Sequence, residues 1–177
     1  DDIAGQSATL VQPASTQRIL DSADIRRVRD NPGKTYMTSN GTVAPYTFTT
    51  TPENVVERKF IDSGENPSLG VVITYYLNDV PTEKITLTFA DSDGNTLREF
   101  TSMDDDDRKA VKEKPDKSVI YLTANAGWNR FVWDMRLPTS PAVTDNDVQF
   151  ERMAGPPVTP GDYQVTLTAN GEAITQP

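Results

Sequence analysis

The stretch that decides the fold is Asn125-Ala-Gly-Trp-Asn-Arg-Phe-Val-Trp-Asp-Met-Arg-Leu-Pro138, which carries both tryptophans of the chain. From Asn129 onward the residues alternate between two faces, which is the period of a half-buried β-strand. The apolar face holds Phe131, Trp133, Met135 and Leu137, and the opposite face holds Arg130, Val132, Asp134 and Arg136. The pattern therefore predicts a strand with Trp133 in the core. Trp128 lies just ahead of this strand, where it either caps the core or stands in solvent.

Short alternating segments divided by turn residues surround this stretch, from Gly64 to the end of the chain. We expect further strands at residues 71–77, 84–90, 96–100, 118–123 and 163–169. Asp93-Gly94 and Asn170-Gly171 are turn sequences that close hairpins. In one of these strands, alternation turns inward the side chains of Ile85, Leu87 and Phe89. The prediction is an all-β, Ig-like antiparallel β-sandwich of about seven strands, over residues 62–177.

Residues 1–61 lack sustained periodicity, and we expect them to form an extended linker or strap that packs on the sandwich. Residues 15–29 fit a short helix poorly, and an extended path is an equal alternative. The acidic run Asp104 to Asp107 and the charged residues after it have almost nothing to bury, which predicts a solvated loop. Residues 138–160 are rich in Pro, Asp and Thr and predict a long connection.

Composition argues against several classes of function. The chain has 17 Lys and Arg against 26 Asp and Glu, a net charge of -9, which would repel nucleic acid. It contains no cysteine and no histidine, which removes disulfides, thiolate nucleophiles and the usual zinc ligands. No apolar run is long enough for a membrane span, and Asp1-Asp2-Ile3 does not begin a signal peptide.

Six segments carry a resemblance to a known family: Gly64-Glu-Asn-Pro67, Val72-Ile-Thr-Tyr-Tyr-Leu77, Ala90-Asp-Ser-Asp-Gly-Asn95, Leu97-Arg-Glu-Phe100, Gly127-Trp-Asn-Arg-Phe-Val-Trp-Asp-Met-Arg136 and Pro160-Gly-Asp-Tyr163. Together they resemble the C-terminal domain of bacterial sortilin-like proteins with Asp-box (BNR) repeats. In that family a large β-propeller precedes an Ig-like sandwich similar to that of the flagellar hook-capping protein. The resemblance implies a piece of a larger secreted or periplasmic protein, without its propeller. Trp128 departs from the family pattern, which has an aliphatic residue there.

The hairpin Asp91-Ser-Asp-Gly-Asn95 is a candidate metal site. Asp91, Asp93 and Asn95 offer oxygen ligands, as calcium loops do, but the later glycine and glutamate of an EF-hand are missing. A type I′ or bulged hairpin explains Asp93-Gly94 without an ion. A structural calcium ion is therefore the alternative to a plain turn, and we expect no other cofactor.

Exposed aromatic residues are the main candidates for binding, because sugars stack on the faces of Trp and Tyr rings. Tyr75 and Tyr76 point to opposite faces of their strand, so one of them faces outward. The candidate ligand-binding residues are Trp128, Tyr46 and Tyr76, whereas Tyr163 is read as a tyrosine corner that ties a turn to the sheet.

No pair of carboxylates falls in a recognisable catalytic setting, so an enzyme is not expected. The leading hypothesis is a non-catalytic accessory module of a larger secreted protein that binds polysaccharide. The alternative is a purely structural domain that braces an adjacent propeller, with residues 1–61 as the connecting strap.

Overall fold

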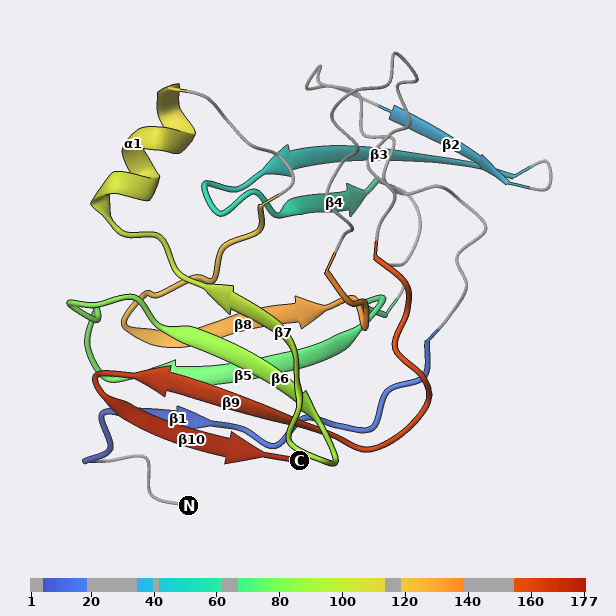
Figure 1. Ribbon diagram of the computed structural model, residues 1–177. Coiled ribbons are helices and arrows are strands. Elements are labelled where there is room, and N and C mark those ends of the chain that lie inside the picture. The colour runs from blue at the N-terminus through green and yellow to red at the C-terminus, as the bar shows by residue number, and fades with distance from the viewer. Residues whose placement is uncertain (1–4, 19–34, 40–41, 62–66, 114–118, 139–154) are drawn as a thin grey trace, which may run out of the picture.

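Two antiparallel sheets pack face to face in the computed structural model, which describes residues 5–18, 35–39, 42–61, 67–113, 119–138 and 155–177 (Figure 1). One sheet has the order β1-β5-β8 and contains β1 (Ala8–Leu10), β5 (Val71–Leu77) and β8 (Gly127–Trp133). The other has the order β10-β9-β6-β7 and contains β6 (Thr86–Asp91), β7 (Thr96–Thr101), β9 (Tyr163–Ala169) and β10 (Glu172–Gln176). These three- and four-stranded sheets confirm the predicted all-β sandwich of about seven strands.

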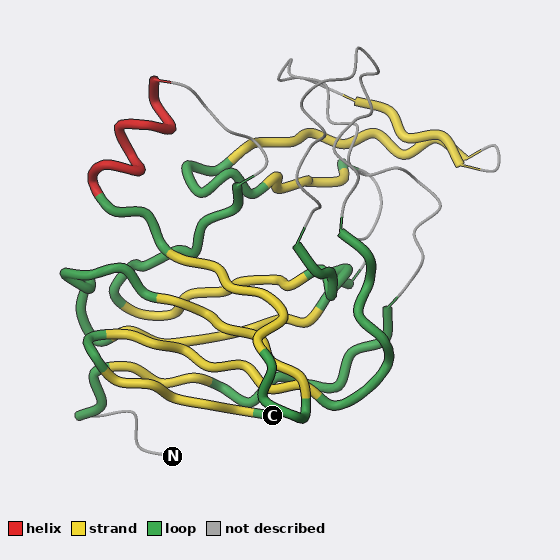
Figure 2. Tube along the Cα trace, viewed as in Figure 1, coloured by secondary structure: helices red, strands yellow, loops and turns green. Residues whose placement is uncertain are grey.

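A third antiparallel sheet lies beside the sandwich and comes from the N-terminal third of the chain (Figure 2). Its order is β2-β3-β4, with β2 (Thr35–Ser39), β3 (Thr42–Thr50) and β4 (Val56–Phe60). The β3–β4 turn is attached to the segment before β8, where the backbone N–H of Tyr121 donates to the carbonyl of Glu53 at 3.1 Å. The Asn54 amide also donates to the carbonyl of Val119 at 2.9 Å.

The N-terminal segment reaches the sandwich through β1, which pairs with β5 in the register Ala8↔Leu77 and Leu10↔Tyr75. Most of the alternative helix at residues 15–29 and most of the connection at 138–160 lie outside the described residues. The boundary between residues 61 and 62 stays a prediction.

The core follows the alternation of the strands. Trp133 is 2% exposed and stacks on Phe89, with 4.3 Å between ring centroids and 27° between ring planes. The predicted inward residues are buried in the same cluster, including Ile85, Leu87 and Phe131. Stacked aromatic rings and close packing of this kind dominate the stability of a small core. The prediction that alternation places Trp133 inside is confirmed.

The tryptophan strand is shorter than its sequence pattern predicts, because β8 ends at Trp133 instead of continuing to Leu137. Met135 has a φ of 54°, a left-handed conformation that breaks the alternation. Beyond this point the backbone pairs with a later segment: the N–H of Leu137 donates to Pro156 O, and the N–H of Val158 donates to Met135 O, both at 2.9 Å. The change of hydrogen-bonding partner ends the strand.

Helix α1 (Asp105–Glu113) replaces the solvated loop expected here, and that prediction was wrong. The carboxylate of Asp104 accepts from the N–H of Asp107 at 2.8 Å, and the carboxylate of Asp107 accepts from the N–H of Asp104 at 3.2 Å. Such a reciprocal cap starts a helix without any apolar face, and α1 buries no residue. Lys84 binds both carboxylates, at 3.0 and 2.7 Å, which fixes the helix start to the sandwich.

The strand expected at 118–123 is also absent from the described residues 119–123, where Leu122 makes a single parallel bridge to Ser102.

Candidate functional site

The turn before β8 determines which way Trp128 points. Asn129 is 5% exposed, and its side-chain amide donates to the carbonyls of Asn125 at 2.7 Å and Gly127 at 3.0 Å. Its Oδ1 accepts from the backbone N–H of Asn125 at 3.1 Å. Because successive side chains on a strand point to opposite faces, the inward Asn129 turns Trp128 outward. The question that the sequence left open is therefore answered: Trp128 is 56% exposed.

Tyr76 lies directly across from Trp128, in the neighbouring strand β5. The two rings meet nearly edge to face, with 5.3 Å between centroids and 67° between planes. Cross-strand aromatic pairs of this geometry stabilise each other. Tyr76 thus holds the indole in place while more than half of the Trp128 surface remains in solvent.

The aromatic pair is part of a longer surface, the outer face, which we define as the outward side chains of β5 and β8. On β5 these are Val72, Thr74 and Tyr76, and on β8 they are Trp128, Arg130 and Val132. They form three cross-strand pairs: Tyr76↔Trp128, Thr74↔Arg130 and Val72↔Val132. Since a strand rises by about 3.3 Å per residue, the face extends about 13 Å from the first pair to the third.

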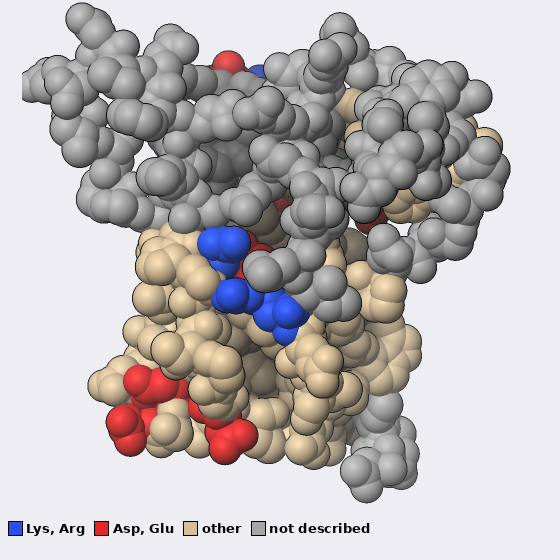
Figure 3. All heavy atoms as spheres, turned by 90° about the vertical axis from the view of Figure 1, so that its right-hand side faces the viewer, with Lys and Arg blue, Asp and Glu red and all other residues tan. Residues whose placement is uncertain are grey.

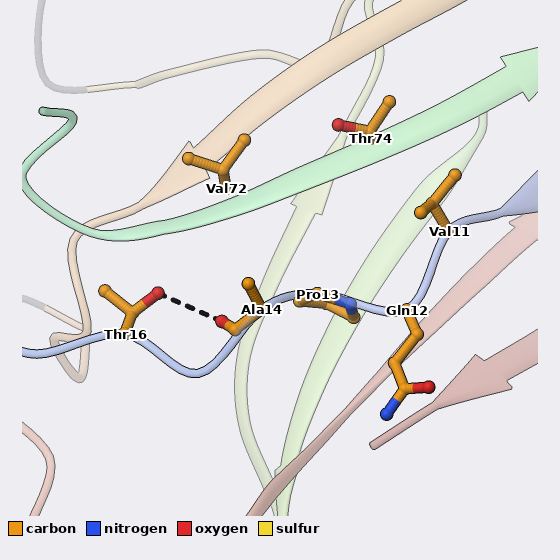
Figure 4. A pocket seen from close by; sticks show the side chains of 7 residues that line it. All are labelled: Val11, Gln12, Pro13, Ala14, Thr16, Val72 and Thr74. Carbon is orange, nitrogen blue, oxygen red and sulfur yellow. Dashed lines mark hydrogen bonds between the residues drawn. The ribbon is translucent and has the colours of Figure 1, made fainter.

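A hollow of about 250 Å³ borders this face at its Val72 end (Figure 4). Residues 11–16 form one wall as they run beside β5, where the N–H of Val11 donates to Thr74 O at 3.0 Å. Figure 4 shows Val72 and Thr74 rising from β5 beside this segment. The hollow is lined by Val11, Gln12, Pro13, Ala14, Thr16, Val72 and Thr74.

Tyr46 does not join the outer face, and its reading as an exposed aromatic was wrong. It lies on β3 in the third sheet, is 8% exposed and packs against Phe60 with 5.7 Å between ring centroids. Its burial comes from the pairing of β3 with β4, which sets Tyr46 opposite Phe60. Of the three predicted aromatics, the structure brings together Trp128 and Tyr76.

Both oxygens of the Asp91 carboxylate, the first of the three proposed calcium ligands, accept hydrogen bonds within the turn. Its Oδ1 accepts from the N–H groups of Asp93 at 3.0 Å and Asn95 at 2.8 Å, and its Oδ2 accepts from the Asn95 amide at 3.0 Å. The Asn95 side chain and backbone lower the pKa of Asp91, because they bond its charged form. Among the described residues, no group of three or more His, Cys, Asp or Glu side chains is arranged to hold a metal ion.

Two tyrosines have structural roles. The hydroxyl of Tyr163 donates to the carbonyl of Thr159, and its ring meets Trp133 edge to face, which confirms the predicted tyrosine corner. The hydroxyl of Tyr75 donates to Thr123 O at 2.6 Å, and burial raises the pKa of Tyr75 to about 12. Tyr75 therefore ties the segment before β8 to the core.

Sequence reasoning missed Arg130 and the wall at residues 11–16 as parts of a site. Alternation did place Arg130 on the outward face of its strand. Its position beside Trp128 and opposite Thr74 follows from the β5–β8 register, which no local pattern contains.

Charge is unevenly distributed on the molecule. Figure 3 shows Lys and Arg side chains gathered at the centre of one end of the sandwich, whereas Asp and Glu gather below them. Among the described helical residues, no segment is long and apolar enough to cross a membrane.

Comparisons with known proteins do not identify a relative of the chain. No family model, curated protein or solved structure matches the chain. The resemblance to the sandwich domain of sortilin-like proteins accordingly stays a prediction from the sequence.

Proposed function

We propose that the chain is a non-catalytic module that binds polysaccharide on the outer face of β5 and β8. The observation that carries this proposal is the exposed indole of Trp128, held by Tyr76 across two paired strands. An apolar ring of this size in solvent provides a stacking surface for the C–H groups of a sugar. Because the ring is already fixed, little conformational entropy is lost when a ligand binds.

The polar groups along the outer face complement this stacking surface. Tyr76 and Thr74 each provide a hydroxyl that donates and accepts hydrogen bonds, and Arg130 provides further donors. These polar groups span about 6.7 Å along the strands, and the whole outer face extends about 13 Å, which exceeds the width of one sugar ring. An extended polymer can therefore contact Trp128 and the middle of the face at the same time.

The shape of the surface favours a polymer over a small molecule. Pockets for small ligands enclose most of the ligand in roughly 300–1,000 Å³. The hollow beside Val72 and Thr74 has only about 250 Å³, and Trp128 lies outside it. A polysaccharide that lies along the outer face would contact both Trp128 and the hollow.

The test measures binding of the whole chain to a panel of soluble polysaccharides by affinity electrophoresis and calorimetry. We expect Trp128→Ala to weaken binding at least about 30-fold, as expected for a central aromatic worth about 2 kcal/mol. Ile61→Ala, at a residue that is 54% exposed and follows β4 of the third sheet, is the control and should bind as the parent chain does.

Circular dichroism must show the same fold for both variants. The proposal is wrong if no polysaccharide of the panel binds, or if the Trp128 variant binds with unchanged affinity.

A second candidate function is bracing of a neighbouring domain. It is favoured by three partly exposed aliphatic residues where the third sheet meets the segment before β8: Val55, Val119 and Ile120. In a longer natural chain, Val119→Ser with Ile120→Ser would loosen the contact and increase proteolysis between the domains, whereas Trp128→Ala would not. Unchanged proteolysis of the double variant would argue against bracing.

A further inference from the structure

Arg130 is a cation beside the aromatic pair, and among the residues that the structure describes it has no anionic partner. It follows Trp128 by two residues on the same face of β8, a separation of about 6.7 Å along the strand. Its side chain is exposed, and its Nη2 donates to the hydroxyl of Ser68 at 2.5 Å. Within the described residues, the carboxylates in ion pairs are bound to Lys84 and Lys109, and none of these ion pairs includes Arg130.

The surroundings of Arg130 contrast with the acidity of the whole chain. The segments that build the outer face and its wall, residues 8–16, 71–77 and 127–133, contain no Asp or Glu. Arg130 is the one charged side chain in these three segments, although the chain as a whole has a net charge of -9. The outer face therefore has positive charge in a protein that is otherwise acidic.

We propose that the polysaccharide bound here is acidic, and that Arg130 binds the carboxylate of a uronic acid unit next to the sugar stacked on Trp128. This inference rests on the proposed function and adds the class of sugar to it. A guanidinium offers five N–H donors in a plane, and two of them match the two oxygens of a carboxylate. The bond to Ser68 occupies one donor and orients the group, so the others remain for the ligand.

The net charge of the chain does not prevent this contact. At physiological ionic strength, charges in water are screened beyond about 8 Å. Since residues 8–16, 71–77 and 127–133 contain no carboxylate, the acidic residues belong to other segments of the chain. An acidic sugar bound to Arg130 is in contact with a cation, and carboxylates farther away than about 8 Å act on it only weakly.

The experiment compares polygalacturonate with its fully methyl-esterified form, which has the same backbone without the charge. Calorimetry on the whole chain, repeated at several salt concentrations, should give at least about tenfold tighter binding of the acidic form, equivalent to about 1.4 kcal/mol. Alginate and hyaluronan serve as second and third acidic polymers.

The variants separate this inference from the proposed function. Arg130→Gln should lose the preference for acidic polymers, and Arg130→Lys should keep part of it, because lysine retains the charge but not the planar fork. Arg108→Gln on α1 changes the net charge equally and should keep the full preference. Trp128→Ala should weaken binding of acidic and esterified forms alike.

Three results would overturn the acidic-sugar inference while leaving the proposed function intact. The first is binding of the neutral polysaccharides of the panel alone, and the second is equal binding of polygalacturonate and its methyl-esterified form. The third is an undiminished preference for acidic polymers in Arg130→Gln. If no polymer binds, or if Trp128→Ala binds normally, the proposed function itself fails.

Discussion

Substituting Asn129 with Ala tests how much its hydrogen bonds stabilise the turn that precedes the tryptophan strand. The side chain of Asn129 is buried and makes three hydrogen bonds to the backbone of the turn, two to Asn125 and one to Gly127. An intramolecular hydrogen bond contributes about 1 kcal/mol net, so their loss should lower the free energy of unfolding by about 3 kcal/mol. Water that enters the loosened turn would reduce this to about 2 kcal/mol.

Urea unfolding followed by far-ultraviolet circular dichroism measures this cost. With a slope of about 2 kcal/mol per molar urea, the midpoint should fall by about 1 to 1.5 M. Asn125→Ala is the matched control, since the groups of Asn125 that bond Asn129 belong to its backbone. The control should stay within about 0.5 kcal/mol of the parent chain. A loss below about 0.5 kcal/mol in Asn129→Ala would refute the role assigned to this side chain.

Three further predictions concern the scaffold. A Cβ added at Gly70 would lie 2.1 Å from the backbone oxygen of Trp133, so Gly70→Ala should clearly lower the melting temperature. A Cβ added at Gly161 would have its nearest neighbouring atom at 3.9 Å, so Gly161→Ala is the control and should leave the melting temperature nearly unchanged. Equal melting temperatures of the two variants would contradict the close approach at Gly70. Tyr163→Phe removes the hydrogen bond to Thr159 and should cost about 1 kcal/mol in chemical unfolding, and a neutral result would show that the corner is dispensable. Asp104→Ala should reduce the helical signal at 222 nm and leave the tryptophan fluorescence of the core unchanged, because Asp104 caps α1. The N–H groups of Asp107 and Asp106 and the charge of Lys84 lower the pKa of Asp104, with the Asp107 bond as the largest cause. Its contribution is therefore present above the unfolded value of about 3.9 and is lost as the pH falls through the lower folded value, so an α1 signal that is constant during acid titration would contradict this.

The core residues of the sandwich could be predicted from the sequence because strand alternation is a local property. Side chains two apart share a face, so the apolar residues of β6 and β8 showed their inward positions without knowledge of the partner strands. Ile85, Leu87, Phe89 and Trp133 are all nearly inaccessible to solvent. Turn sequences were equally local, and Asn170 and Gly171 both have the positive φ that a tight hairpin requires.

Helix α1 had a local signal of a different kind. Hydrophobic periodicity gives no indication of a helix that buries nothing, whereas the spacing of Asp104 and Asp107 is that of a reciprocal cap. The sequence contained this signal, but periodicity alone did not reveal it.

Only the tertiary structure decided which residues meet at the candidate site. The pairing of β5 with β8 brings Tyr76 against Trp128 and Thr74 against Arg130, and a register shift of one residue would have separated them. The same kind of long-range pairing buried Tyr46 against Phe60. Alternation determines which face a side chain occupies, whereas its neighbours on that face depend on how whole strands pair, which is a property of the folded chain.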